Sequence, residues 1–194
     1  MLYLASTSPR RRMLIRRLRR SFRMVRSDHR ETIRRGDSPS QAVMRNAQGK
    51  ARRAHVPRGA SGIVIGADTA VYFRGHVIGK PKTLAQAQRI LQALQGRSHW
   101  VYTGVCLQDS STGRWRAAYE KTKVTFKRLS DETITQLFTR ASPLDKAGGY
   151  ALQADRGDLI ARIDGSRTNV IGLPLERLRR ELRLMKRASH CPEP

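Results

Sequence analysis

The segment at residues 6–11, Ser-Thr-Ser-Pro-Arg-Arg, combines residue types that suit phosphate binding. It follows a short apolar run, and Ser8 with Pro9 predicts a helix start, because serine caps free amides and proline fits the first helical position. The free amides and positive dipole end of such a helix favour an anion. Arg10 and Arg11 oppose that dipole, which again favours an anionic ligand. An ordinary cap on a helix with a solvated basic face explains the same residues.

Two carboxylates could take part in catalysis or hold a metal. Asp68 comes after the apolar run 62–66, which is typical of a buried strand, and ligand sites in α/β folds lie beyond the carboxyl ends of strands. A carboxylate there can bind a cation or accept a proton from water. Glu31 is the second candidate, in a stretch rich in cations. An Asx-turn at Asp68 and a surface ion pair at Glu31 are the structural alternatives.

Three lysines stand in unusual local settings. Lys50 lies in a helix with few acids, Lys80 in a Gly-Lys-Pro turn and Lys146 in a glycine-rich loop. Lysine is a point charge suited to phosphate, although any one of them could equally be a solvated surface residue. Neither a Ser/His/Asp nor a Cys/His pattern stands out, and the histidines lack metal-site spacing.

The elements that would position these residues alternate between helices and strands. The patterns predict helices at about 9–20, 39–54, 84–95, 130–139 and 175–186, and strands at 2–5, 21–27, 62–66, 98–109, 114–128 and 158–164. A hairpin-like passage is expected at 71–79, and the strands 98–109 and 114–128 should form an antiparallel hairpin. We therefore expect an α/β fold with a mixed central sheet and flanking helices in a single domain at 1–187, followed by a frayed tail at 188–194.

The composition narrows the class of protein. The chain has 194 residues and a net charge of +24, which is typical of a partner for nucleic acid, a membrane surface or a polyanionic small molecule. Arginine also accumulates on ordinary solvated surfaces, so the charge alone does not decide. No apolar run approaches the ~20 residues of a membrane span. The sequence has only two cysteines, Cys106 and Cys191, which cannot build a disulfide framework or a zinc site. We therefore expect the protein in a reducing cytoplasm.

The candidate residues belong to a larger set of ordered motifs. These are Leu-Ala-Ser-Thr-Ser-Pro-Arg-Arg at 4–11, Glu31, Lys-Ala at 50–51, Gly-Ala-Asp-Thr at 66–69, Gly-Lys-Pro at 79–81, Val-Tyr-Thr-Gly-Val at 101–105, Leu-Asp-Lys-Ala-Gly at 144–148 with Tyr150 and Gln153, and Gly-Leu-Pro at 172–174. In this order and spacing they closely resemble the Maf family of nucleoside triphosphate pyrophosphatases, across nearly the whole chain.

The resemblance implies hydrolysis of a nucleoside triphosphate to the monophosphate and pyrophosphate, assisted by Mg²⁺ or Mn²⁺. It also implies a sheet divided into two lobes, a fold like that of inosine triphosphate pyrophosphatases, with the active site in the cleft between the lobes, and it allows for a homodimer. The family's proton acceptor falls on Asp68, Glu31 matches the other acidic position, and both would hold the metal. The phosphate-handling positions fall on Ser8, Arg10, Arg11, Lys50 and Lys80, of which Lys80 is expected to assist catalysis.

The expected substrate also comes from the resemblance. One branch of the family has Asp-Lys-Ala-Gly with a later Gln and hydrolyses dTTP and UTP, whereas another has Cys-Ala-Gly with Glu and prefers 7-methyl-GTP. This chain has Lys146 and Gln153 in the pattern of the first branch, and Arg10 and Thr69 also match it. The glutamine amide offers a donor and an acceptor to the imide edge of a pyrimidine. A structural hydrogen bond is the alternative role for Gln153.

This chain also departs from the family pattern. It has Asp-His-Arg at 28–30, where relatives often have glycine and further acids, so the number of carboxylates near the metal is open. Asn46 and Gly49 stand in a helix where better helix formers are usual, and glycine there costs on the order of 1 kcal/mol. Position 70 is alanine rather than a bulkier residue.

Two rival functions remain at this stage. One is the same chemistry on another base, such as 7-methyl-GTP. The other is a basic protein that binds nucleic acid, although the retained Glu31, Asp68 and Lys80 and the scarcity of aromatic residues in basic stretches argue against it. We therefore expect a cytoplasmic enzyme whose partner is a nucleoside triphosphate. We expect it to bind neither a specific nucleic acid nor a membrane.

Overall fold

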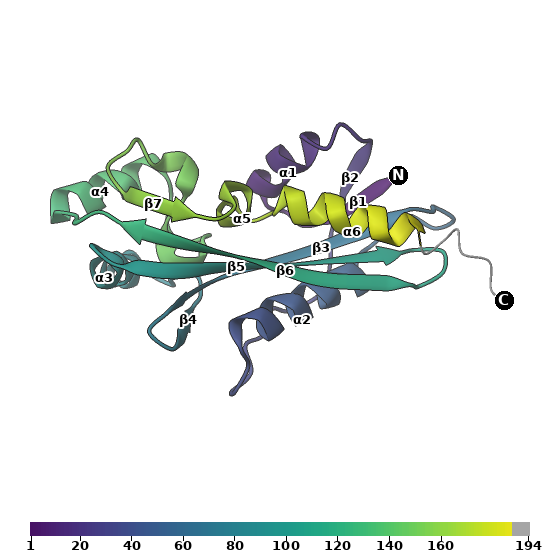
Figure 1. Cartoon of the computed structure of the whole chain (residues 1–194), viewed down its shortest axis with the longest axis horizontal. Coiled ribbons are helices and arrows are strands. Elements are labelled where there is room, and N and C mark those ends of the chain that lie inside the picture. The colour runs from purple at the N-terminus through teal and green to yellow at the C-terminus, as the bar shows by residue number, and fades with distance from the viewer. Residues whose placement is uncertain (188–194) are drawn as a thin grey trace. The chain divides into compact units, whose positions relative to one another are not determined.

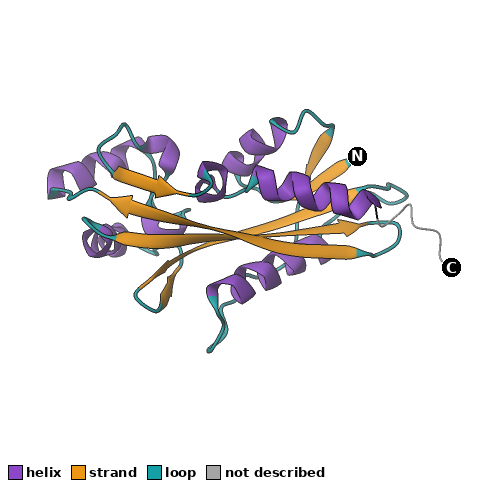
Figure 2. Cartoon of the chain, viewed as in Figure 1, coloured by secondary structure: helices purple, strands orange, loops and turns teal. Residues whose placement is uncertain are grey.

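A computed structural model describes residues 1–187, and the tail expected at 188–194, with Cys191, lies outside the described residues. The chain forms a seven-stranded mixed sheet in the order β2-β1-β3-β5-β6-β7, with β4 paired to β3, as expected (Figures 1 and 2). It divides into two compact units: one comprises residues 1–68, 103–120 and 172 onward, and the other 69–102 and 121–171. No helix within residues 1–187 is long and apolar enough to span a membrane.

The first unit is built on parallel strands joined by helices. β1 (Leu2–Ala5) pairs in parallel with β2 (Phe22–Val25) on one side and with β3 (Ile63–Phe73) on the other. α1 (Pro9–Arg16) connects β1 to β2, and α2 (Pro39–Arg52) connects β2 to β3. All four residues of β1 are buried, as expected for a central strand between two neighbours.

The helices of this unit cover both faces of its strands. α2 lies on one side, and α1 and α6 (Leu175–Arg187) lie on the other (Figure 1). Two glycines let α2 approach closely, because a Cβ at Gly66 on β3 would lie 2.0 Å from Ala47 O, and one at Gly104 on β5 (Ser98–Asp109) would lie 2.4 Å from Val43 O. The close packing fixes the helix that carries Asn46 and Lys50.

The second unit has its own apolar core. β3 continues into it and pairs antiparallel with β4 (His76–Ile78), while β6 (Trp115–Phe126) pairs antiparallel with β7 (Ile160–Asp164). Its helices are α3 (Leu84–Leu94), α4 (Asp131–Arg140) and α5 (Arg167–Ile171), with short 3-10 turns at Ala147–Gly149 and Leu152–Ala154. The core joins strand and helix residues: Val71, Leu91, Leu94, Val101, Val124, Phe126, Leu129, Ile134, Leu137 and Leu159.

Several boundaries differ from those expected. The first helix ends at Arg16 rather than Arg20, and Arg19 adopts a left-handed φ of 51° that cannot continue a helix. The strand expected to end at residue 66 continues to Phe73, so Asp68 lies within β3 and not after it. Helix α5 is not among the helices that the sequence predicted.

A buried histidine lies in the core of the second unit. His99 is 1% exposed, its Nε2 lies 2.8 Å from Tyr150 Oη, and its ring packs edge-on against Phe126. Burial lowers the pKa of His99 from 6.5 to about 4. Among the described residues Nδ1 has no hydrogen-bond partner, so a second proton on the ring would be buried without an acceptor.

This histidine should make the stability of the protein depend on pH. Because the pKa of His99 is lower in the folded chain than in the unfolded chain, the unfolded chain binds more protons as the pH falls from 6.5 toward 4, and stability falls with it. From this group alone, the free energy of unfolding should be about 2 kcal/mol lower at about pH 5 than at about pH 7. Urea titrations of the wild type and His99→Gln would measure this. The same pH dependence in both proteins would assign it to another group.

Candidate active site

The candidate site in the first unit lies where β1 and β2 end. Ala5, the last residue of β1, pairs with Val25 of β2 and Gly66 of β3. The segments that follow Ala5 and Val25, and the continuation of β3 through Asp68, therefore leave the paired region at the same edge. Ser8, Glu31 and Asp68 are carried by these three segments.

At the centre, one lysine joins the two carboxylates. Lys50 Nζ donates to Asp68 Oδ1 at 2.8 Å, to Glu31 Oε1 at 2.6 Å and to the backbone oxygen of Ala67 at 3.1 Å. The side chains of Lys50 and Asp68 are only 11% and 10% exposed, whereas that of Glu31 is 41% exposed. An ammonium group has three donors, and all three bind protein acceptors here. In this arrangement Lys50 joins the two carboxylates.

The basic turn after β1 lies close to this group. Ser8 caps α1, with its Oγ accepting from the backbone N of Arg11 at 3.5 Å, and Pro9 occupies the first turn, as expected. Arg11 Nε donates to Gly172 O at 2.8 Å. Burial lowers the pKa of Arg11, while the negative charges of Asp68 and Glu31 raise it and that of neighbouring Arg10 lowers it. The turn thus brings cationic side chains within electrostatic range of both carboxylates.

Asp28 does not join the central carboxylates. Its Oδ2 lies 2.6 Å from His55 Nε2, and both side chains are exposed. Within residues 1–187, no group of three or more His, Cys, Asp or Glu side chains is placed to hold a metal ion. The carboxylates bridged by Lys50 are therefore two, Glu31 and Asp68.

The remaining expected site residues belong to the second unit. Thr69 follows Asp68 in β3, and Lys80 is exposed in the turn after β4. Gly148 N donates to Gly79 O at 3.1 Å, which holds this turn beside the loop of Lys146. The ammonium of Lys146 is paired with Asp145 and also binds Ser142 O. Gln153 is exposed in the turn at Leu152–Ala154.

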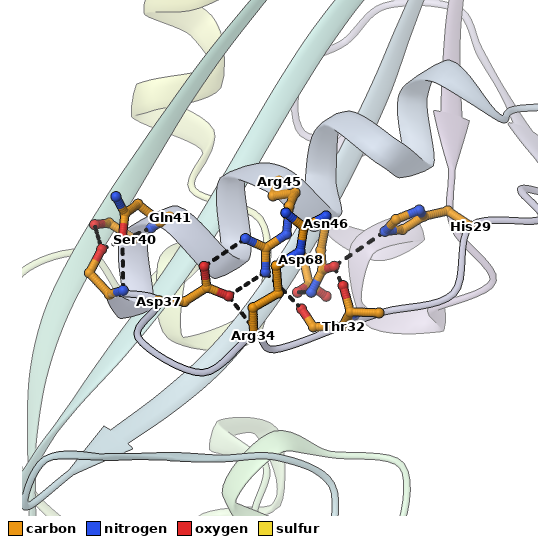
Figure 3. A network of polar contacts seen from close by, with 10 residues as sticks. His29, Thr32, Arg34, Asp37, Ser40, Gln41, Arg45, Asn46 and Asp68 are labelled. Carbon is orange, nitrogen blue, oxygen red and sulfur yellow. Dashed lines mark hydrogen bonds and ion pairs between the residues drawn. The ribbon is translucent and has the colours of Figure 1, made fainter.

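Asn46 contacts Asp68 directly, a role that the sequence did not reveal. Its Nδ2 donates to Asp68 Oδ2 at 2.9 Å, and its Oδ1 accepts from Thr32 N at 3.0 Å and lies 3.2 Å from His29 Nε2 (Figure 3). It stands one helical turn before Lys50, so both side chains occupy one face of α2. A polar residue on the buried face of a predicted helix is the signal that could have identified it.

Almost the whole chain matches one protein family. The family model described as "Maf-like protein" matches residues 1–185. A dTTP/UTP pyrophosphatase of Bacillus cytotoxicus is 42% identical over 180 residues, which cover 93% of each chain. Another of that name, from Pelotomaculum thermopropionicum, is 41% identical over 175 residues, covering 90% of this chain and 91% of its own. A third, from Clostridium tetani, is 37% identical over 90% of this chain and 92% of its own. Since both the family model and these relatives span almost its entire length, the chain belongs to the Maf family.

Proposed function

We propose that this protein is a nucleoside triphosphate pyrophosphatase that hydrolyses dTTP and UTP to the monophosphate and diphosphate. The observation that carries the proposal is the pair of carboxylates, Asp68 and Glu31, joined by the buried ammonium of Lys50. Full-length relatives named dTTP/UTP pyrophosphatase support the substrate class.

The proposed reaction is attack of water on the α-phosphorus. Asp68 accepts a proton as the new P–O bond forms, the bond from the α-phosphorus to the bridging oxygen breaks, and pyrophosphate leaves with that oxygen. Asp68 suits this role because Lys50 and Asn46 hold its two oxygens in fixed positions. A triphosphate carries about four negative charges, so approach of the nucleophile requires nearby cations.

The cations of the chain supply part of that neutralisation. Arg10 and Arg11 lie in the first turn of α1, directly after the capping hydroxyl of Ser8, and Lys80 and Lys146 lie in adjoining segments of the second unit. We propose that they bind the phosphates, with Lys80 acting on the reacting phosphoryl group. For Lys50 we propose a positioning role, because its three donors bind Glu31, Asp68 and Ala67.

A divalent cation fits the donor set of this site. Mg²⁺ prefers oxygen ligands and is commonly bound by one or two carboxylates together with substrate phosphates and water. Glu31 and Asp68 provide two such carboxylates, both paired with the ammonium of Lys50. They are the residues that would hold Mg²⁺ or Mn²⁺. When bound, the metal would neutralise phosphate charge and lower the pKa of a coordinated water.

The candidate residues come from both compact units, and we propose that residues 1–187 act as one catalytic domain in the cytoplasm. Neither unit carries the full set, because Asp68 and Glu31 belong to the first unit and Lys80 and Gln153 to the second.

We expect Gln153 to select the base. Uracil and thymine present an N–H donor between two carbonyl acceptors, and an amide can pair with both kinds of group, whereas a carboxylate can only accept. Gln153→Glu should therefore lower kcat/KM for dTTP and UTP about tenfold or more, the size expected when a hydrogen bond in a binding site is lost. Steady-state rates on dTTP, UTP and CTP measure this, with Gln88→Glu on α3 as the control. Unchanged selectivity would assign Gln153 a structural role.

The test of the proposed function is product analysis on a panel of nucleotides. Purified protein with Mg²⁺ or Mn²⁺ is incubated with dTTP, UTP, CTP, GTP and 7-methyl-GTP, and pyrophosphate and monophosphate are quantified. We expect equal amounts of both products from dTTP and UTP. Release of single phosphates, or no turnover of any triphosphate, would contradict the proposal, and preference for 7-methyl-GTP would overturn only the choice of base.

A further inference from the structure

Asn46 connects Asp68 to the segment that carries Glu31. Its amide nitrogen donates to Asp68 Oδ2 at 2.9 Å, and its amide oxygen accepts from Thr32 N at 3.0 Å. Since an amide oxygen only accepts, His29 Nε2 at 3.2 Å is the donor of a further hydrogen bond. Asn46 is 2% exposed, and its bond to Asp68 is buried, whereas its bonds to Thr32 and His29 are partly buried.

The neighbouring residue of α2 binds the same segment. Arg45 Nη2 donates to Thr32 O at 3.3 Å, and its guanidinium forms an ion pair with Asp37 (Figure 3). Both backbone hydrogen-bonding groups of Thr32 are thus held by consecutive residues of α2. Glu31 directly precedes Thr32, so its position is set by this attachment.

Gly49 provides the space that the His29 ring occupies. A Cβ at position 49 would lie 2.3 Å from two atoms of that ring. Glycine is a poor residue for a helix interior, and no positive φ requires it at position 49. The residue that weakens the helix is therefore the one that admits the partner of Asn46.

We propose that Asn46 is a positioning residue, which orients Asp68 through its amide nitrogen and fixes the Glu31 segment through its amide oxygen, with His29 seated over Gly49. The role in catalysis rests on the proposed function, but the attachment of the segment does not. A side chain that holds a catalytic or metal-binding group commonly affects activity by about 10- to 100-fold.

Three variants separate this role from a general effect on folding. Asn46→Leu removes all the polar contacts while keeping the branching of the side chain at Cγ. Asn46→Asp keeps an acceptor for Thr32 and His29 but places a second carboxylate beside Asp68. Gln48→Leu is the matched control, because Gln48 lies on the same helix and is partly exposed.

We expect both Asn46 variants to lower kcat for dTTP about 10- to 100-fold with less than about threefold change in KM, because the phosphate-binding cations remain. Gln48→Leu should behave as the wild type. Amide hydrogen exchange at Thr32, followed by NMR, should accelerate in Asn46→Leu and stay slow in Asn46→Asp. That exchange does not depend on the substrate.

The outcomes are distinguishable. If the wild type turns over no triphosphate, the proposed function and the catalytic role of Asn46 both fail. Amide exchange at Thr32 then remains the test of whether Asn46 holds the Glu31 segment. A folded Asn46→Leu or Asn46→Asp with wild-type kcat would overturn the positioning role, as would a loss of activity that only follows the folded fraction. If Asn46→Leu does not fold, Asn46→Asp decides. Gly49→Ala tests whether Gly49 has to leave space for the His29 ring, and this variant should accelerate amide exchange at Thr32. Equal exchange rates in Gly49→Ala and the wild type would overturn that part of the proposal.

Discussion

Replacing Asp68 by asparagine should reduce pyrophosphate release from dTTP by at least about a hundredfold and by up to about 10⁴-fold, the range that a positioned acid or base contributes. The amide matches the carboxylate in shape but has no charge and cannot accept the proton of the attacking water. It also removes one of the two carboxylates that would hold the metal. Single-turnover assays with Mg²⁺ measure the effect, and near-wild-type rates in Asp68→Asn would remove Asp68 from the chemistry.

The contacts of Asp68 also define a control for this experiment. In Asp68→Asn, a new amide nitrogen would face either Lys50 Nζ or Asn46 Nδ2, both of which are donors in the wild type. The double variant Asn46→Asp with Asp68→Asn restores a donor–acceptor pair between the two positions while moving the charge to α2. We expect the double variant to regain stability and to remain inactive, because the carboxylate is no longer at position 68. Recovery of activity would show that the site needs a carboxylate but does not need it at position 68.

Local signals were sufficient to predict most elements of the fold. Ser8 and Pro9 mark the start of α1, and the expected strand at 98–109 has the observed bounds of β5. One error lies where neighbouring strands override local preference. Asp68 disfavours a strand, yet β3 continues through it because β4 pairs with its far end and the carboxylate is bonded by Asn46 and Lys50.

The sequence indicated candidate residues by type, and the structure brings some of them together through contacts that the sequence did not indicate. The turn at 6–11, Glu31 and Asp68 were identified from type and spacing, and parallel pairing of β1 with β2 and β3 explains why they share one edge. The bond of Lys50 to Asp68 joins residues 18 positions apart, and that of Asn46 to Asp68 joins residues 22 apart. Asn46 and Gly49 are poor helix formers, which was the one indirect sign of these contacts. In the structure Asn46 bonds Asp68 and Thr32, and Gly49 leaves space for the His29 ring.

Gly66→Ala should destabilise the protein by more than about 3 kcal/mol, at or beyond the upper end of the usual cost of adding a methyl group to a packed core. The new Cβ would lie 2.0 Å from Ala47 O and 2.8 Å from Ala51 N. Both are backbone atoms of α2, so no side chain can rotate away and the helix itself has to move. Urea titration followed by fluorescence measures the loss.

The displacement should also reach the site, because α2 carries Asn46 and Lys50, whose contacts with Asp68 are set by the distance between helix and strand. Any folded Gly66→Ala protein should therefore lose activity as well as stability. Gly104→Ala should act on stability in the same way, since its Cβ would lie 2.4 Å from Val43 O. Gly79→Ala is the matched control, because a Cβ there meets nothing within 4 Å, and its stability should equal that of the wild type. Equal stability of Gly66→Ala and Gly79→Ala would mean that α2 does not need to lie this close to β3.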